Sequence, residues 1–167
     1  MGEERAKDKR NIGIQLVTFR LGSEYYGTPV WMVREIIRPI EVFQVPGMRG
    51  PVEGVINLRG VIIPVLKIHA VLGAPCSDSS EVGKKQRIVI LDSGDGEFGF
   101  MVDDVMEVVR VASEDVKPPP EMGATPSGQD AILGIVQLSG RLIICIDPRQ
   151  LVTGCMDLGE LTESCTE

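Results

Sequence analysis

The chain repeats one pattern of apolar and glycine residues, and this repeat limits the possible folds more than any other sequence feature. Residues 26–38 (YGTPVWMVREIIR) match residues 98–110 (FGFMVDDVMEVVR) at an offset of 72, sharing the glycine, two valines, the glutamate and the arginine. Residues 54–60 (GVINLRG) recur as residues 134–140 (GIVQLSG) at an offset of 80. The extra eight residues fall in the loop 117–131, and the first offset also sets Val45-Pro46 against Lys117-Pro118. Such matches predict two copies of one packing scheme.

Each copy has the composition of a β-rich unit. The chain has 19 glycines and 11 prolines, and its apolar residues are mostly aliphatic, since only 4% of all residues are aromatic. This mixture favours short strands joined by turns. We expect strands over 14–21 and 87–91, a hairpin over 54–66 with its corner at Arg59-Gly60, and a short helix over 67–72 ended by Gly73. Two such units side by side predict two small barrels with a groove suited to an elongated partner.

Charge and hydropathy exclude several classes of function. The net charge is −7 and the pI about 4.8, which disfavours a nucleic-acid partner. No apolar run approaches the roughly 20 residues of a membrane helix, and the charged start does not resemble a secretion signal. The four cysteines have no metal-binding or redox spacing, and Cys145 is expected in the core. These features predict a soluble, cytoplasmic protein without membrane insertion.

The search for catalytic chemistry gives no strong candidate. His69 is the only histidine and is assigned a structural or surface role. The pair Asp103-Asp104 is expected to cap a helical turn, and residues 92–96 (DSGDG) are interpreted as a hairpin turn and not a calcium loop. The sequence therefore predicts no catalytic residue, no cofactor and no metal site.

Positions where the two copies differ point to function more than those where they agree. Arg59 has Ser139 as its counterpart, so the fold does not need arginine at this corner. Its guanidinium could bond a carboxylate or carbonyl of a partner, or it could be a solvated surface group. Glu35 has the counterpart Glu107, which indicates a structural role common to both copies.

Two further differences concern the fold. Trp31 lies opposite Asp103 and is either a core residue or an interface anchor. Pro64 lies opposite Ile144 and removes a backbone donor, so its strand is not expected to be paired on both sides there.

Residues 54–65 (GVINLRGVIIPV) resemble the hallmark segment of CheW-type chemotaxis coupling proteins. Other segments resemble the family in the same order, over a span of about 14–152. They are residues 26–27 (YG), 33–37 (VREII), 45–46 (VP), 87–90 (RIVI), 99–105 (GFMVDDV) and 132–134 (ILG).

The resemblance implies a mainly β fold, with two SH3-like five-stranded β-barrel subdomains around a shared core and one or two short helices. It implies a non-enzymatic adaptor that couples chemoreceptor cytoplasmic tips to the regulatory domain of the histidine kinase CheA. Receptor binding in the family uses the groove between the subdomains. Carried over by position, the receptor-binding residues are Val33, Glu35, Ile36 and Arg59, with Ile88 and Gly99 facing them from the second unit.

The match is not complete. The Asp-Leu-Arg-like segment usual in the family is Lys67-Ile68-His69 here, and the second copy has Asp147-Pro148. The resemblance therefore does not assign the kinase-binding surface.

We expect a tail over 1–11, a domain over 12–155 and an acidic tail over 156–167. The domain comprises halves at about 12–74 and 86–155, whose strands can cross between the barrels. The alternatives are a regulatory or coupling module of another two-component pathway, a ligand-binding β-barrel, and an enzyme with its site in the groove.

Overall fold

The computed structural model describes residues 13–47, 52–73, 82–94, 96–118 and 131–151. The predicted tails 1–11 and 156–167 lie outside these residues. The elements are β1 (Ile14–Leu21), β2 (Glu24–Pro29), η1 (Val30–Met32), β3 (Val33–Ile37), β4 (Val52–Leu58), β5 (Val61–Leu66), α2 (Ile68–Leu72), α3 (Val82–Lys85), β6 (Arg87–Asp92), β7 (Glu97–Val102), β8 (Asp104–Val111), η2 (Ser113–Asp115), β9 (Ile132–Leu138) and β10 (Arg141–Ile146). No helix in the described ranges is long and apolar enough to cross a membrane.

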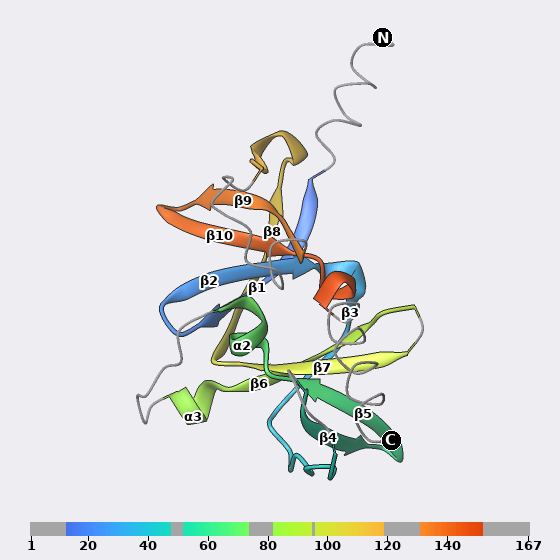
Figure 1. Cartoon of the computed structure of the whole chain (residues 1–167). Helices are drawn as coiled ribbons and strands as arrows, with labels where there is room; N and C mark the ends of the chain where they lie inside the picture. Colours follow the sequence, from blue (N-terminus) through green and yellow to red (C-terminus); the bar gives the residue numbers. More distant parts are fainter. Residues whose placement is uncertain (1–12, 48–51, 74–81, 95, 119–130, 152–167) are drawn as a thin grey trace.

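The strands form two five-stranded sheets, with orders β8-β1-β2-β10-β9 and β3-β6-β7-β5-β4 (Figure 1). Because β1 to β5 of the first repeat correspond to β6 to β10 of the second, the two orders are the same. Each sheet takes a hairpin, β1–β2 or β6–β7, from one repeat and the other three strands from the other repeat. The prediction of a mainly β fold with two five-stranded units and short helices is confirmed.

The core has a shared central part and one smaller part within each sheet. The central cluster combines Phe19, Leu21 and Tyr26 of the first sheet with residues of the second such as Leu91 and Phe100. The two smaller clusters contain equivalent residues, with Ile56, Val65 and Ile88 in one and Val136, Cys145 and Leu16 in the other. Cys145 is 2% exposed, so its predicted core position is confirmed.

Both long hairpins turn through two residues with positive φ. The angles are 52° at Arg59 and 84° at Gly60, and 53° and 78° at Ser139 and Gly140. Two positive values in a two-residue loop are characteristic of a type I′ turn. The predicted corner is confirmed, as is the helix end at Gly73, whose φ is 67°.

The predicted helical turn at Asp103-Asp104 is wrong. Asp104 begins β8, and Asp103 is 3% exposed. The Asp103 carboxylate accepts a 2.6 Å hydrogen bond from the backbone N–H of Gly22, in the β1–β2 turn, and lies 3.5 Å from His69 Nε2. A buried carboxylate thus binds an otherwise unpaired turn amide, where sequence reasoning expected a helix cap.

One part of the repeat alignment is also wrong. Isolated bridges join Phe43 to Val55 and Lys117 to Ile135. Because Val55 and Ile135 are equivalent, Phe43 and not Val45 is the counterpart of Lys117. The loops before these bridges differ in length by two residues, which the alignment through the Val45-Pro46 dipeptide did not detect.

Pro64 behaves as predicted. It pairs with Val55 on one side, while the parallel pairing of β5 with β7 includes only Val65 and Leu66. The equivalent Ile144 is paired on both sides, with Ile135 and Tyr26.

Candidate partner-binding surface

The sheet order brings the predicted site residues onto adjacent strands. In the second sheet β3 neighbours β6, and β6 neighbours β7. Arg59 comes to the same region from the corner between β4 and β5. The strand positions are Val33, Glu35 and Ile36 on β3, Ile88 on β6 and Gly99 on β7.

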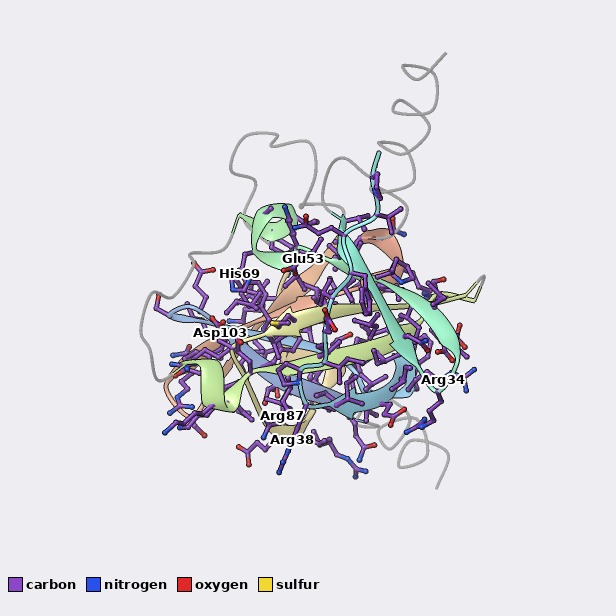
Figure 2. The ribbon with its side chains drawn as sticks, turned by 90° about the horizontal axis from the view of Figure 1, so that it is seen from below. Arg34, Arg38, Glu53, His69, Arg87 and Asp103 are labelled. Atoms are coloured by element: carbon purple, nitrogen blue, oxygen red, sulfur yellow. The ribbon has the colours of Figure 1, made fainter. Side chains whose placement is uncertain are left out.

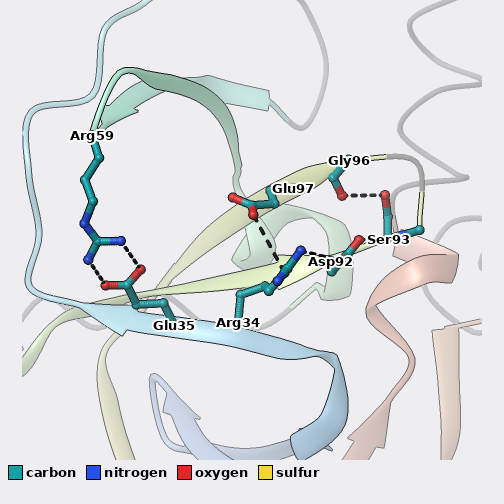
Figure 3. A network of polar contacts seen from close by, with 8 residues as sticks. Arg34, Glu35, Arg59, Asp92, Ser93, Gly96 and Glu97 are labelled. Carbon is teal, nitrogen blue, oxygen red and sulfur yellow. Dashed lines mark hydrogen bonds and ion pairs between the residues drawn. The ribbon is translucent and has the colours of Figure 1, made fainter.

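A bulge in β3 sets the direction of its side chains. Val33 pairs with Leu91 and Glu35 with Ile90, so Arg34 has no partner in the β6 register. Its guanidinium instead forms ion pairs with Asp92 at 3.3 Å and Glu97 at 3.7 Å (Figure 3). Such a bulge re-aims the residues that follow it.

The residue after the bulge, Glu35, forms a two-pronged ion pair with Arg59. The Arg59 Nη1 and Nη2 atoms donate to the two carboxylate oxygens at 3.0 and 2.5 Å (Figure 3). The hydrogen bond and the charge of Glu35 raise the pKa of the guanidinium. The side chains are 72% and 32% exposed, so the pair is expected to stabilise the fold little and chiefly to orient both groups. Arg59 is therefore neither a lone solvated cation nor a wholly free partner for another carboxylate.

The second repeat has no counterpart of this ion pair. Ser139 replaces the arginine, and the backbone N–H and carbonyl of Glu107 bond Thr18 Oγ1 at 3.2 and 2.6 Å. The predicted common role of Glu35 and Glu107 does not extend to the ion pair, which is specific to the first repeat.

Apolar residues adjoin the two residues of the pair along β3 and at the hairpin corner. Ile36 is 39% exposed, and Val33 is half-buried against the central core. Val61 and Ile62, which follow the hairpin corner, are 53% and 61% exposed. Sequence reasoning did not select Val61 and Ile62, although two adjacent apolar residues at a hairpin end are a sign that one faces solvent. We call Val33, Glu35, Ile36, Arg59, Val61 and Ile62 the β3–hairpin surface.

Ile88 lies on β6, the strand beside β3, and Gly99 lies on β7, and neither is part of this surface. Ile88 is fully buried. A Cβ atom on Gly99 would approach Ile90 Cδ1 to 3.1 Å and Ile88 Cγ2 to 3.2 Å. These residues set the packing of β6, the strand next to β3, and in this conformation their side-chain positions do not reach the surface.

Two hollows occupy equivalent places in the two repeats but differ in chemistry. One of about 400 Å³ has polar lining from Glu53, Lys67, His69 and Gln86. The other, of about 290 Å³, has Leu133, Asp147, Arg149 and Ile14 at those positions, next to Trp31. Trp31 is 68% exposed, which excludes the core position, and Arg149 lies 5.3 Å from its ring centre. Within the described ranges, no three or more His, Cys, Asp or Glu side chains come together as metal ligands would.

Comparison with known proteins shows which family the chain is similar to. Residues 15–155 match the model of the CheW-like domain. The chemotaxis protein CheW of Treponema pallidum is 34% identical over 139 residues, which cover 82% of this chain and 81% of that protein. The CheW of Bacillus subtilis is 31% identical, over 81% of this chain and 84% of its own length. The crystal structure of the scaffolding protein TtCheW from Thermoanaerobacter tengcongensis matches with a TM-score of 0.74 at 30% identity, over 83% and 87% of the two chains.

Proposed function

The chain belongs to the CheW family, and from this membership we propose that it is a cytoplasmic, non-enzymatic adaptor of bacterial chemotaxis. It couples the cytoplasmic tips of chemoreceptors to the regulatory domain of the histidine kinase CheA. Support comes from the family match over residues 15–155 and from relatives named as chemotaxis proteins and as a scaffolding protein.

The observation that favours one receptor site is the ion pair between Glu35 and Arg59. It fixes two charged groups next to exposed apolar residues, Ile36 following Glu35 on β3 and Val61 following the hairpin corner. A receptor tip is a hairpin of two helices, and a helix binds such a surface through apolar anchors, with charges that set its orientation. We therefore assign receptor binding to the β3–hairpin surface.

Ile88 and Gly99 have an indirect role in this proposal. A larger side chain at Gly99 would push against Ile88 and Ile90, and these residues of β6 pair with Ile37 and Glu35 of β3, so the push would displace the strand that presents Glu35 and Ile36. Substitution at Gly99 is thus expected to impair receptor binding through the shape of the surface.

The proposal is tested by calorimetric titration of the purified chain with a chemoreceptor cytoplasmic fragment and, separately, with the CheA regulatory domain of the same bacterium. We expect both to bind. Absence of both interactions would contradict the adaptor role, and turnover of phosphorylated or acyl substrates above the buffer rate would favour an enzyme.

Arg59→Ala tests the assigned surface. We expect about tenfold weaker receptor binding, because the substitution removes one charge and frees Glu35 from its fixed orientation. The melting temperature should stay within about 2 °C of the unaltered protein, since the ion pair is exposed.

Ser139→Ala, at the equivalent corner, is the matched control and should change neither quantity. A large fall in melting temperature for Arg59→Ala would instead give the arginine a structural role.

A further inference from the structure

Four cations gather where β3 ends and β6 begins. Ile37 pairs with Ile88, so the register places Arg38 opposite Arg87, and Lys84 and Lys85 end α3, one residue before β6 begins. Figure 2 shows Arg38 and Arg87 beside each other and Arg34 far from them. We call Arg38, Lys84, Lys85 and Arg87 the basic cluster. A concentration of positive charge is notable in a chain whose net charge is −7.

The cluster is not neutralised within the described part of the chain. Arg34 and Arg59 have carboxylate partners within 4.0 Å, whereas no described carboxylate lies that close to any cation of the cluster. Arg87 Nη1 donates to the backbone carbonyls of Gln86 at 2.7 Å and Lys84 at 3.4 Å. These bonds orient the guanidinium but leave its charge uncompensated, so it remains available to an anion.

The fold does not require this cluster. The positions equivalent to Arg38 and Arg87 are Arg110 and Gln15, which pair with each other between β8 and β1. The second repeat therefore has one cation, Arg110, where the first repeat has two, Arg38 and Arg87. Repulsion among like charges lowers the stability of the fold, and the second repeat avoids this loss. The cluster is therefore expected to bind a negative charge outside the chain.

The basic cluster continues the β3–hairpin surface. Ile36 and Arg38 are two residues apart, so their side chains project to the same side of the chain, about 7 Å apart along its direction. One helical turn advances about 5.4 Å. A helix with an apolar residue on Ile36 would thus bring the residue three or four positions away close to Arg38.

We propose that the basic cluster binds carboxylates of the receptor tip, on the helix that contacts Ile36, and so selects receptors with Asp or Glu three or four positions from that apolar anchor. This inference rests on the proposed receptor-binding function and names the chemistry of the partner. It also makes binding dependent on salt, because these cations are exposed and salt screens exposed charges.

The test is titration of the full chain with the chemoreceptor cytoplasmic fragment at 50 and 500 mM NaCl. Arg38→Glu should weaken binding about fivefold to tenfold at 50 mM, and the difference should fall below about twofold at 500 mM. Arg110→Glu is the matched control, and we expect it to bind like the unaltered protein at both salt concentrations. Exchange of the facing receptor acid for lysine should restore binding to Arg38→Glu.

The possible outcomes separate this inference from the proposed function. If the unaltered protein binds the fragment and Arg38→Glu binds equally well at low salt, the inference is wrong and the adaptor function stands. If the unaltered protein binds the CheA regulatory domain but not the fragment, the inference and the receptor-binding assignment are wrong, and if it binds neither, the adaptor function is wrong as well. Loss of binding to the CheA regulatory domain alone, or loss of sedimentation with phosphatidylglycerol vesicles alone, would also overturn the inference by assigning the cluster to another partner.

Discussion

At the corner between β4 and β5 Arg59 reaches Glu35, whereas at the equivalent corner between β9 and β10 Ser139 stands in place of the arginine. The backbone is the same at both corners, since φ is 52° at Arg59 and 53° at Ser139. A non-glycine residue in this region has a conformational cost, and both repeats accept it. The backbone turn is therefore common to both repeats, while the arginine side chain occurs only in the first repeat.

A second equivalent pair differs as strongly. In one place the Asp103 carboxylate lies buried, 3.5 Å from His69. In the other, Trp31 replaces the aspartate and Arg149 replaces the histidine, and their side chains are in cation–π contact. One fold thus has a largely buried polar pair on one side and an exposed aromatic residue on the other.

The largest predicted effect concerns glycines that both repeats share. A Cβ atom at Gly54 would overlap the carbonyl oxygen of Phe43 and approach Val42 Cγ1 to 2.8 Å, and one at Gly134 would overlap Val116 Cγ1 and approach the Lys117 carbonyl oxygen to 2.7 Å. Gly54→Ala and Gly134→Ala should each lower the free energy of unfolding by about 3 kcal/mol, measured by urea denaturation. Gly54→Ala should be the more damaging, because backbone yields less than a side chain. Replacement of Gly96, which has open space around its Cβ position and no positive φ, is the control for loss of a glycine without a clash. An unchanged stability in either variant would contradict the claim that both bridges are tightly packed.

A smaller effect should separate the positions of Asp103 and Trp31. Asp103→Ala removes the acceptor of the buried Gly22 N–H and should lower the free energy of unfolding by about 2 kcal/mol. Trp31→Ala changes a largely exposed side chain and should cost less than about 0.5 kcal/mol in the same urea measurement. Equal losses would mean that the tryptophan has a structural role which its exposure does not indicate.

Sequence reasoning predicted those parts of the fold that depend on local pattern. Alternating apolar residues located the strands, and Gly60 and Gly73 located a turn and a helix end, because their backbone angles are set by nearest neighbours. It allowed strands to cross between the barrels but left open which ones, since either pairing buries the same apolar faces. It also misplaced Asp103, because the amide that this carboxylate binds belongs to Gly22, 81 residues earlier.

The candidate site was predictable in its residue types and not in its contacts. The difference between Arg59 and Ser139 identified the hairpin corner that carries the ion pair. The partner of Arg59, however, depends on a bulge at Arg34 that no sequence pattern indicated. Ile88 was placed near the surface by position alone, although pairing with strands on both sides buries it. The basic cluster was missed because Arg38 and Arg87 are far apart in the sequence and meet only through the β3–β6 register.

The smallest predicted effect appears at alkaline pH and involves Cys145, whose equivalent is Val65. Burial raises the pKa of the Cys145 thiol from 9.0 to about 11. A group whose pKa is raised on folding contributes stability that is complete below its unfolded value and is lost as the pH rises, here from 9 to 11. Burial raises the pKa of the Tyr26 hydroxyl as well, with a further rise from Glu24, while the equivalent residue is Phe98.

Cys145→Val makes the two repeats alike at this position. Between pH 8 and 10 the variant should lose about 1 kcal/mol less stability than the unaltered protein, measured by urea denaturation at each pH. Because the comparison is a difference between two pH values, any constant effect of the valine on packing cancels. The decline in the free energy of unfolding that remains above pH 10 should disappear in Tyr26→Phe. Val65→Ala should lower the free energy of unfolding by the same amount at every pH. Parallel curves for the unaltered protein and Cys145→Val would show that the thiol ionises as readily in the folded protein as in the unfolded chain, against its burial between β2 and β9.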